Sequence, residues 1–278
     1  MIKRVLFFVV FVILFAEVSF SSSLRIVSLS PVVTQEIFML KAQKYLVGCS
    51  KYGIVPKGFE IERVGTVTDA DIERILKLKA NIVFASSLLN PSDVKVLKRL
   101  GIRVIVFSQP ESFKQICDDF IRVGEIVGKK DMAEKIVSEA MKEVNCIKDR
   151  LENVRKLKVF VQIGANPLFT ATGSSFINDF VKFAGGVNIA ENAKSGLYSP
   201  AKVLKENPDA IIISQMGFNG IKQAEKWKQF KFLSAVKHNR ILILNDYSLC
   251  SPTPVSFVKT LFKIAKFLHP EVNLEVCR

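Results

Sequence analysis

The sequence predicts an α/β protein of two similar lobes, each with a parallel central sheet, joined by one long backbone helix. Three observations indicate this fold. Helical patterns alternate with apolar strand patterns, as in parallel sheets covered by helices. Residues 71–86 recur 128 positions later as residues 199–214, each copy a helix, a turn and an apolar run ending in serine. A long segment without Gly or Pro separates the copies. Two lobes form a cleft, which indicates a ligand held between them.

The first half of the chain begins with a short apolar strand, residues 24–29, that ends at Ser30-Pro31. The next segment is predicted to start a helix capped by Thr34. Elements then alternate with β-rich apolar runs, which favours a parallel sheet. The expected order is strand 46–50, helix 69–79, strand 81–86, helix 91–100, strand 103–107 and helix 111–127.

The second half repeats this plan. Between the two sixteen-residue copies, Leu76, Lys77 and Ser86 are identical to Leu204, Lys205 and Ser214, and each copy is followed by a second helix and a second apolar strand. The expected order is strand 158–163, helix 174–184, helix 199–206, strand 209–213, helix 222–236, strand 240–245 and helix 253–268.

The segment Asp131–Asn153 is predicted to be one helix. Its apolar residues recur at spacings of three and four, which makes a single stripe: Met132, Ile136, Ala140, Val144, Ile147, Leu151 and Val154. At 1.5 Å per residue the segment spans about 34 Å, enough to run along both lobes and hold their angle. We therefore expect an N-terminal lobe at 24–130, a linking helix at 131–156 and a C-terminal lobe at 157–278. The alternative is a long core helix within one domain.

Residues 1–23 resemble a secretory signal: Lys3 and Arg4 precede a short apolar run and a small, polar stretch. The run is shorter than the roughly 20 residues of a spanning helix, and the alternative is a retained membrane anchor. No Cys lies near the expected cleavage region, which argues against a lipid-modified N-terminus. The mature protein is therefore expected outside the cytoplasm, in the periplasm or an equivalent extracytoplasmic space.

The net charge of +14 becomes +13 when Lys3, Arg4 and Glu17 leave with the signal. A basic exported protein can bind nucleic acid or anionic surfaces. Here the lysines are scattered along helix faces and are not grouped with stacking aromatics, so solvated faces are the better interpretation. No nucleic-acid partner is expected.

Five cysteines remain after processing, so at least one is unpaired within a monomer. Cys117 and Cys146 lie in helical patterns and are expected to be buried small apolar residues rather than disulfide partners. Export permits a disulfide, but the sequence does not demand one. Cys49, Cys250 and Cys277 form no metal-ligand spacing with them.

The sequence lacks the residue patterns of catalysis and of metal binding. Its two histidines, His238 and His269, have no spaced partner, which disfavours a metal site. A nucleophile with a nearby base is also missing, so a hydrolase is disfavoured. The glycines of 164–173 follow a strand but lack nucleotide-loop spacing. We expect no catalytic residues, no resident cofactor and no enzyme activity.

Aromatic and small polar residues cluster instead where the predicted strands end. In open α/β sheets, ligands bind beyond the carboxyl ends of the strands. A cleft lined by such residues suits a large, flat, partly apolar molecule. The candidate binding residues are Ser30, Pro31, Tyr52, Ser86, Ser87, Phe169, Tyr198, Phe218, Asp246 and Tyr247.

An ordered series of segments resembles the class III periplasmic substrate-binding proteins, which serve ABC importers of cobalamin, ferric siderophores and haem; the vitamin B12-binding members are the most similar. The segments are RIVSLSPVVTQEIF (25–38), VGCSKYGIVP (47–56), DIERILKLKANIVFA (71–85), LKRLGIRVIVF (97–107), VFVQIGANPLFTATGSSFINDFVKFAGGVNI (159–189) and SPAKVLKENPDAIII (199–213). The resemblance implies a non-enzymatic, monomeric receptor that carries a corrinoid or related metal chelate to an ABC permease and its ATPase. The alternative is a ferric siderophore or haem receptor, with Tyr52 or Tyr247 as an iron-coordinating phenolate in the case of haem.

The resemblance also implies residue roles. Tyr52 and Phe169 match aromatics that flank a corrin ring, Tyr198 stands near the place of a tryptophan, and Asp246 matches an acidic pocket residue. The family often has an Arg shortly after that Asp; its absence here argues against a strongly anionic siderophore.

Permease docking is implied in the same way. Glu73 matches the glutamate with which the N-terminal lobe of the family docks on the permease. The repeat places Ala201 at the second docking position, so docking is expected to be asymmetric or to use another acid such as Glu206.

Overall fold

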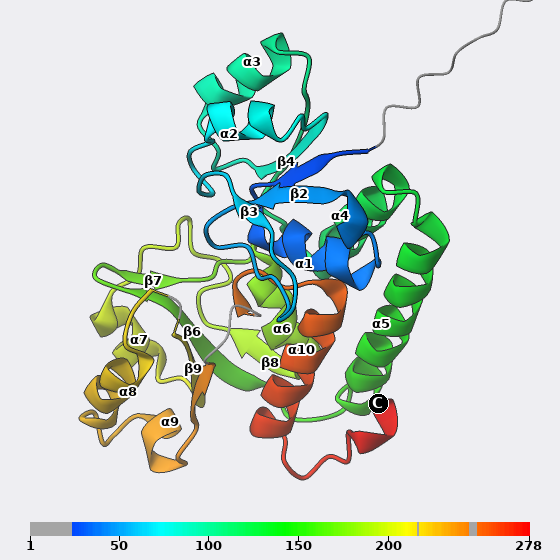
Figure 1. The fold of residues 1–278 in the computed structure, drawn as a ribbon. Coiled ribbons are helices and arrows are strands. Elements are labelled where there is room, and N and C mark those ends of the chain that lie inside the picture. The colour runs from blue at the N-terminus through cyan, green and yellow to red at the C-terminus, as the bar shows by residue number, and fades with distance from the viewer. Residues whose placement is uncertain (1–23, 216, 245–248) are drawn as a thin grey trace, which may run out of the picture.

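The computed structural model describes residues 24–215, 217–244 and 249–278 and shows two lobes, each built around a five-stranded sheet (Figure 1). The predicted signal, residues 1–23, and the candidate ligand residues Asp246 and Tyr247 lie outside the described residues. Within the described ranges, no helix combines the length and the apolar character needed to cross a membrane.

The sheet of the N-terminal lobe is entirely parallel, with strand order β3-β2-β1-β4-β5. Alternate residues of the buried strands point to opposite faces. Phe84 packs on the face covered by α1 and α4, whereas Val83 packs on the face covered by α2 and α3. The strands are β1 (Ile26–Ser28), β2 (Leu46–Cys49), β3 (Glu62–Arg63), β4 (Ile82–Ser86) and β5 (Arg103–Phe107); the helices are α1 (Pro31–Met39), α2 (Ile72–Lys77), α3 (Pro91–Arg99) and α4 (Phe113–Ile126), with a 3-10 turn at Gln43–Tyr45.

The sheet of the C-terminal lobe has strand order β10-β9-β6-β7, with β8 also paired to β6. It departs from the predicted parallel sheet in one place, because β7 pairs antiparallel with β6 as a hairpin. The strands are β6 (Leu157–Ala165), β7 (Leu168–Thr170), β8 (Gly186–Asn188), β9 (Ala210–Ser214) and β10 (Ile241–Leu244); the helices are α6 (Phe176–Phe183), α7 (Pro200–Glu206), α8 (Gly220–Lys228), α9 (Ser234–Lys237) and α10 (Pro254–Leu268), with a 3-10 turn at Glu275–Cys277.

The helix α5 (Lys130–Arg150) runs along the side of both lobes (Figure 1). Its first turns bury Ala133 in a core shared with α1 and α4 of the N-terminal lobe. Farther along, Val144 and Ile147 are buried in the core of the C-terminal lobe with α6 and α10. The predicted apolar stripe is therefore confirmed, and it contributes to two cores rather than one.

The helix predicted over Asp131–Asn153 ends at Arg150. Two further predicted helix boundaries were wrong. Ser30, not Thr34, is the N-cap of α1, because Pro31 lacks an N–H and fits the first helical position. The Thr34 hydroxyl instead donates to the Ser30 carbonyl at 3.1 Å. The single helix expected at 222–236 is divided into α8 and α9, and Ser234 at the start of α9 donates its N–H to Asn207 Oδ1 at 2.8 Å. That tertiary contact leaves no periodic signal in the sequence.

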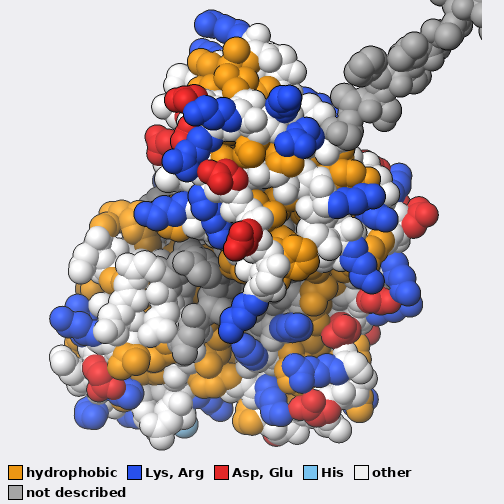
Figure 2. Space-filling model, in the orientation of Figure 1, with side chains coloured by type: hydrophobic (Ala, Val, Ile, Leu, Met, Phe, Trp, Pro, Cys, Tyr) orange, Lys and Arg blue, Asp and Glu red, His pale blue; other side chains and the backbone are white. Residues whose placement is uncertain are grey.

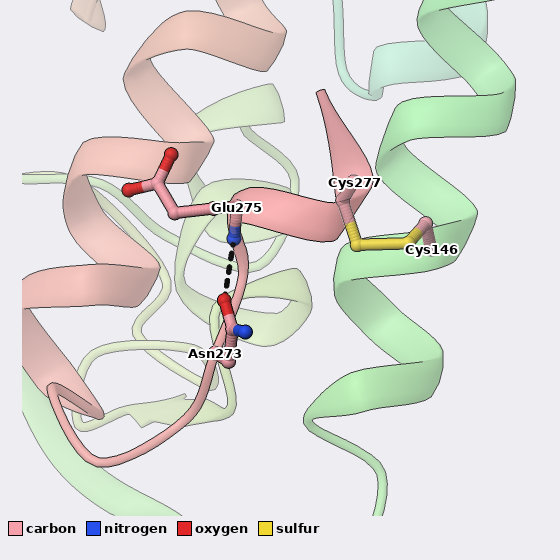
Figure 3. Close-up of a disulfide and its surroundings, with 4 residues drawn as sticks. All are labelled: Cys146, Asn273, Glu275 and Cys277. Atoms are coloured by element: carbon pink, nitrogen blue, oxygen red, sulfur yellow. Dashed lines mark hydrogen bonds between the residues drawn. A yellow bond between two sulfur atoms is a disulfide. The ribbon is translucent and has the colours of Figure 1, made fainter.

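The expectation that Cys146 is an unpaired apolar residue was also wrong. Cys146 on α5 forms a disulfide with Cys277 near the end of the chain (Figure 3). After α10 the chain turns back and brings its last 3-10 turn against α5, and only this return places the two residues together. Cys117 is buried and free, as expected, and burial raises the pKa of its thiol to about 12.

Candidate functional site

A cavity of about 330 Å³ lies between the lobes, at the carboxyl ends of the strands of the N-terminal sheet. The N-terminal lobe supplies most of its wall, and α6 and the segment before α10 close it from the C-terminal lobe. Its lining residues include Ser30, Pro31, Val33, Glu36, Tyr52, Ser86, Leu88, Phe107, Ile116, Asp119, Phe176 and Cys250.

Ser30 and Pro31 reach the cavity because β1 ends and α1 begins at this point. The Ser28 hydroxyl donates to the Ser30 carbonyl at 2.8 Å, which fixes the short connection. Ser86 ends β4, the neighbour of β1, and its hydroxyl accepts a hydrogen bond from the Leu88 N–H at 3.3 Å. Parallel strands that are neighbours bring their carboxyl ends together, so these residues line one wall.

Tyr52 lies in the turn after β2, with 55% of its surface exposed. Arg63 on β3 holds that turn, because one guanidinium nitrogen donates to the carbonyls of Ser50 and Gly53, each at 2.8 Å. The same nitrogen lies 3.0 Å from Cys49 Sγ. The aromatic ring at the cavity therefore stands on a braced turn.

The structure places other predicted binding residues away from this cavity. Ser87 is exposed, and its N–H donates to the Phe107 carbonyl at 2.9 Å. Phe169 is half-exposed on β7 and is not part of the cavity wall. Phe218 packs against the outer core of the C-terminal lobe.

Tyr198 is buried in that same core. Its ring lies 5.8 Å from the Phe160 ring, and its hydroxyl donates to the Ile189 carbonyl at 3.3 Å. Burial, and then the charge of Glu206, raise the pKa of Tyr198. Its contacts are those of a packed core residue. Its predicted role in ligand binding stays a prediction without a contact to the cavity.

The sequence interpretation missed two acidic residues of the cavity wall, Glu36 on α1 and Asp119 on α4. Glu36 is only 3% exposed, and burial and the nearby charge of Asp119 raise its pKa well above the ordinary value. Burial also raises the pKa of Asp119, against the opposing charge of Arg122. A signal was present, because each acid lies one helical turn from a buried apolar residue, Glu36 from Val33 and Asp119 from Ile116.

The proposed docking residues lie outside the cavity. Glu73 is on α2, which with α3 forms the outer end of the N-terminal lobe in Figure 1. Its side chain is 80% exposed, and its carboxylate lies 2.8 Å from Lys77 Nζ. Ala201 is exposed in the first turn of α7, and Glu206 is partly buried at the last turn.

Outside the cavity, the surface charge on the face shown in Figure 2 is mixed. Over the face shown in Figure 2, Lys and Arg side chains are spread across both lobes, among acidic and apolar side chains. Within the part of the chain that the structure describes, no three His, Cys, Asp or Glu residues form a group that could hold a metal ion.

The comparisons with known proteins agree on one family. The family described as periplasmic binding protein matches residues 26–247. An uncharacterized ABC transporter substrate-binding lipoprotein, YvrC of Bacillus subtilis, is 24% identical over 90% of this chain and 82% of its own length. A vitamin B12-binding protein of Yersinia pseudotuberculosis is 28% identical over 68% of this chain and 69% of its own.

A solved structure supports the fold. The periplasmic heme-binding protein HutB of Vibrio cholerae superimposes with a TM-score of 0.79, covering 89% of this chain and 99% of its own, at 18% identity. At that identity the likeness concerns the two-lobed architecture alone.

Proposed function

Because the chain belongs to the periplasmic binding protein family, whose members bind and deliver substrates rather than catalyse reactions, we propose that it is the substrate-binding receptor of an ABC importer. Its cargo is a corrinoid or a related metal chelate, held between the lobes. The main support is the cavity at the carboxyl ends of β1, β2, β4 and β5. The similarity to a vitamin B12-binding protein, which covers 68% of this chain, adds to it.

The wall of the cavity suits a flat, partly apolar ligand. Pro31, Leu88, Phe107 and Phe176 supply apolar surface, and a few polar groups lie between them. A volume of about 330 Å³ is near the lower end of small-molecule sites. A macrocycle would therefore insert one edge and rest its remaining face at the mouth, where Tyr52 is exposed.

Haem is the alternative cargo, and one residue favours it. The Tyr52 phenol lines the cavity on a braced turn, and as a phenolate it would coordinate the iron of a haem bound there. A ferric siderophore would use the same cavity. The absorption spectrum of protein purified from its native host separates the three chelates, because corrinoid, haem and ferric catecholate have different visible bands.

The direct test replaces Tyr52 with Ala and titrates cyanocobalamin and hemin by calorimetry. Loss of the ring should weaken binding of the true ligand class by about 1–3 kcal/mol. Phe232→Ala is the matched control, since Phe232 is also 55% exposed but lies outside the cavity wall. Unchanged affinity in Tyr52→Ala would remove this ring from the site. Binding of neither compound by the wild type would reject the proposed cargo.

Phe169→Ala belongs in the same series. The resemblance predicts that Phe169 contacts the ring from the C-terminal lobe, and its half-exposed side chain is available for that contact. Asp246 and Tyr247 remain predicted ligand contacts.

We also propose that Glu73 docks the receptor on its permease, with Glu206 as the second acidic contact in place of Ala201. Glu73→Ala should leave ligand affinity intact and lower transport in reconstituted vesicles, because a basic residue on the permease loses its partner. Glu225→Ala is the control: Glu225 is an exposed helical acid that also lies 2.8 Å from a lysine, Lys228. Ala201→Glu should tighten docking. Equal transport by Glu73→Ala and Glu225→Ala would reject the role of Glu73.

The remaining features of this proposal concern processing and assembly. Residues 1–23 act as a cleaved export signal, and the mature chain works as a monomer in the periplasm or an equivalent space. Residues 24–130 and 157–278 form the lobes, linked by residues 131–156.

A further inference from the structure

Two acidic side chains face the interlobe cavity from helices that pack against each other. Glu36 comes from α1 and Asp119 from α4, and both contribute to the cavity wall. Around them the wall is apolar, with Val33 and Ile116 buried on the same two helices. A low-dielectric surrounding of this kind strengthens the interaction of either carboxyl group with whatever enters the cavity.

Glu36 has no partner of its own within the described ranges. No hydrogen bond or ion pair reaches its carboxyl group there, and although 97% of the residue surface is buried, its oxygens keep access to the cavity and are not among the fully buried atoms without a partner. Buried polar groups are normally hydrogen-bonded, and an unpaired one is costly. The cavity is the space that this carboxyl group faces, so a bound molecule is the partner that would satisfy it.

The charges around the pair leave the site acidic. Asp119 raises the pKa of Glu36, which shows that the two carboxyl groups act on each other. The Arg122 guanidinium opposes the rise in the pKa of Asp119 and lies 5.2 Å from the Phe107 ring centroid, whereas Asp118 on the same helix is paired with Lys114 outside the cavity wall. Where Glu36 holds its proton, Asp119 still supplies the acidic group at this wall, and the carboxyl oxygens of both residues can accept hydrogen bonds. The pair therefore opposes a ligand carboxylate and favours a hydrogen-bond donor.

We propose that Glu36 and Asp119 form an acidic subsite that selects ligands presenting carboxamide or amine donors at this wall and rejects ligands presenting carboxylates. The inference rests on the proposed function and narrows its cargo. A corrinoid with amidated side chains carries donors around its ring, whereas haem carries carboxylates on its propionates. The subsite thus favours the amide-bearing chelate.

The test compares wild type with the double variant Glu36→Gln/Asp119→Asn, using cyanocobalamin and hemin as probes. The control is Asp118→Asn, because Asp118 is adjacent, exposed and paired with Lys114 at 2.6 Å outside the cavity wall. Measured at about pH 8 by calorimetry, the double variant should bind hemin about tenfold more tightly and cyanocobalamin several-fold more weakly. The control should change neither affinity by more than about twofold.

The inference is overturned if the ratio of the hemin affinity to the cyanocobalamin affinity is the same in the double variant and in Asp118→Asn. Asp119→Asn alone should shift the ratio in the same direction, which keeps the test valid if the double variant folds poorly.

Failure of the proposed function looks different, because then the wild type binds neither probe. In that case the subsite is tested with a cationic and an anionic fluorescent dye, auramine O and anilinonaphthalene sulfonate. The double variant should lose affinity for the cationic dye relative to Asp118→Asn. An unchanged preference between the dyes overturns the inference.

Discussion

At the scale of single residues, the molecule retains a buried carboxyl group at a cost in stability. Glu36 is almost fully buried, and burial, followed by the charge of Asp119, raises its pKa above the ordinary 4.5. The folded protein therefore keeps its proton at pH values where the unfolded chain has released it. Because the folded state then binds more protons, the free energy of unfolding falls as the pH rises above 4.5 toward the raised pKa.

Glu36→Gln should remove this pH-dependent loss while keeping the shape of the side chain. Relative to wild type, the variant should gain free energy of unfolding as the pH increases from about 4 to about 8, with little difference at the acid end. Urea unfolding across that range measures the effect, and Glu225→Gln on an exposed helix provides the control. A difference between variant and wild type that does not change with pH would contradict this account of Glu36.

At the scale of elements, the internal repeat is preserved down to backbone conformation. Lys79 and Asn207 occupy the same place in the two copies, 128 positions apart, and have φ values of 50° and 47°. Two residues later, the side chains of Asn81 and Asp209 each accept a hydrogen bond from a backbone N–H, at 3.0 and 2.9 Å. These contacts tie the start of β4 to β1 and the start of β9 to β6. Each lobe therefore turns from helix to strand in the same way.

Glycine is expected to have opposite effects on stability at the two left-handed positions, because a lysine occupies one and an asparagine the other. Lys79→Gly should raise the free energy of unfolding by about 1 kcal/mol, because a side chain is unfavourable in this region and glycine is not. Asn207→Gly should lower it by about 1 kcal/mol, since Asn tolerates the conformation and its Oδ1 accepts a hydrogen bond from the Ser234 N–H at 2.8 Å. Thermal and urea unfolding measure the stability of both variants. Changes in the free energy of unfolding that have the same sign in the two variants would contradict this explanation.

At the scale of the whole molecule, α5 packs on both lobes, and the last residues of the chain fix the second half of this helix to the C-terminal lobe. The Cys146–Cys277 disulfide joins α5 to the 3-10 turn that follows α10, across a sequence separation of 131 residues (Figure 3). Other contacts hold the same end. Lys266 Nζ lies 2.8 Å from Glu275, and the Arg278 guanidinium lies 4.0 Å from the centre of the Phe262 ring. The native position of the C-terminus therefore has support besides the covalent bond.

Cys277→Ser should keep the native fold and lower the free energy of unfolding by about 2–4 kcal/mol, because the unfolded chain gains freedom when the loop is opened. Denaturant unfolding with and without a reducing agent measures this. Reduced wild type should fall to the level of the variant, and the variant should not respond to the reductant. A wild type that is equally stable in both conditions would show that the disulfide does not contribute.

The local sequence determined the elements and much of their order. The apolar stripe of α5, the alternation of strands and helices and the repeat are short-range periodicities, and each reports which face of an element is buried. The same information placed Ser30, Pro31, Tyr52 and Ser86 at strand ends, and these four residues line the cavity. Because neighbouring strands of a parallel sheet have their carboxyl ends at the same edge, residues at those ends come together in the folded lobe.

Only the tertiary structure decided which distant segments meet. It paired Cys146 with Cys277, turned β7 back on β6, buried Tyr198 against Phe160 and brought Glu36 and Asp119 to one wall. Periodicity cannot predict these contacts, because it gives a residue's face on its own element but not the partner opposite that face. In the sequence alone, an acidic residue on an apolar helix face only interrupts the apolar pattern. Its role becomes apparent from the cavity beside it. The partner is set by how the lobes pack, and so is the chemistry of the site.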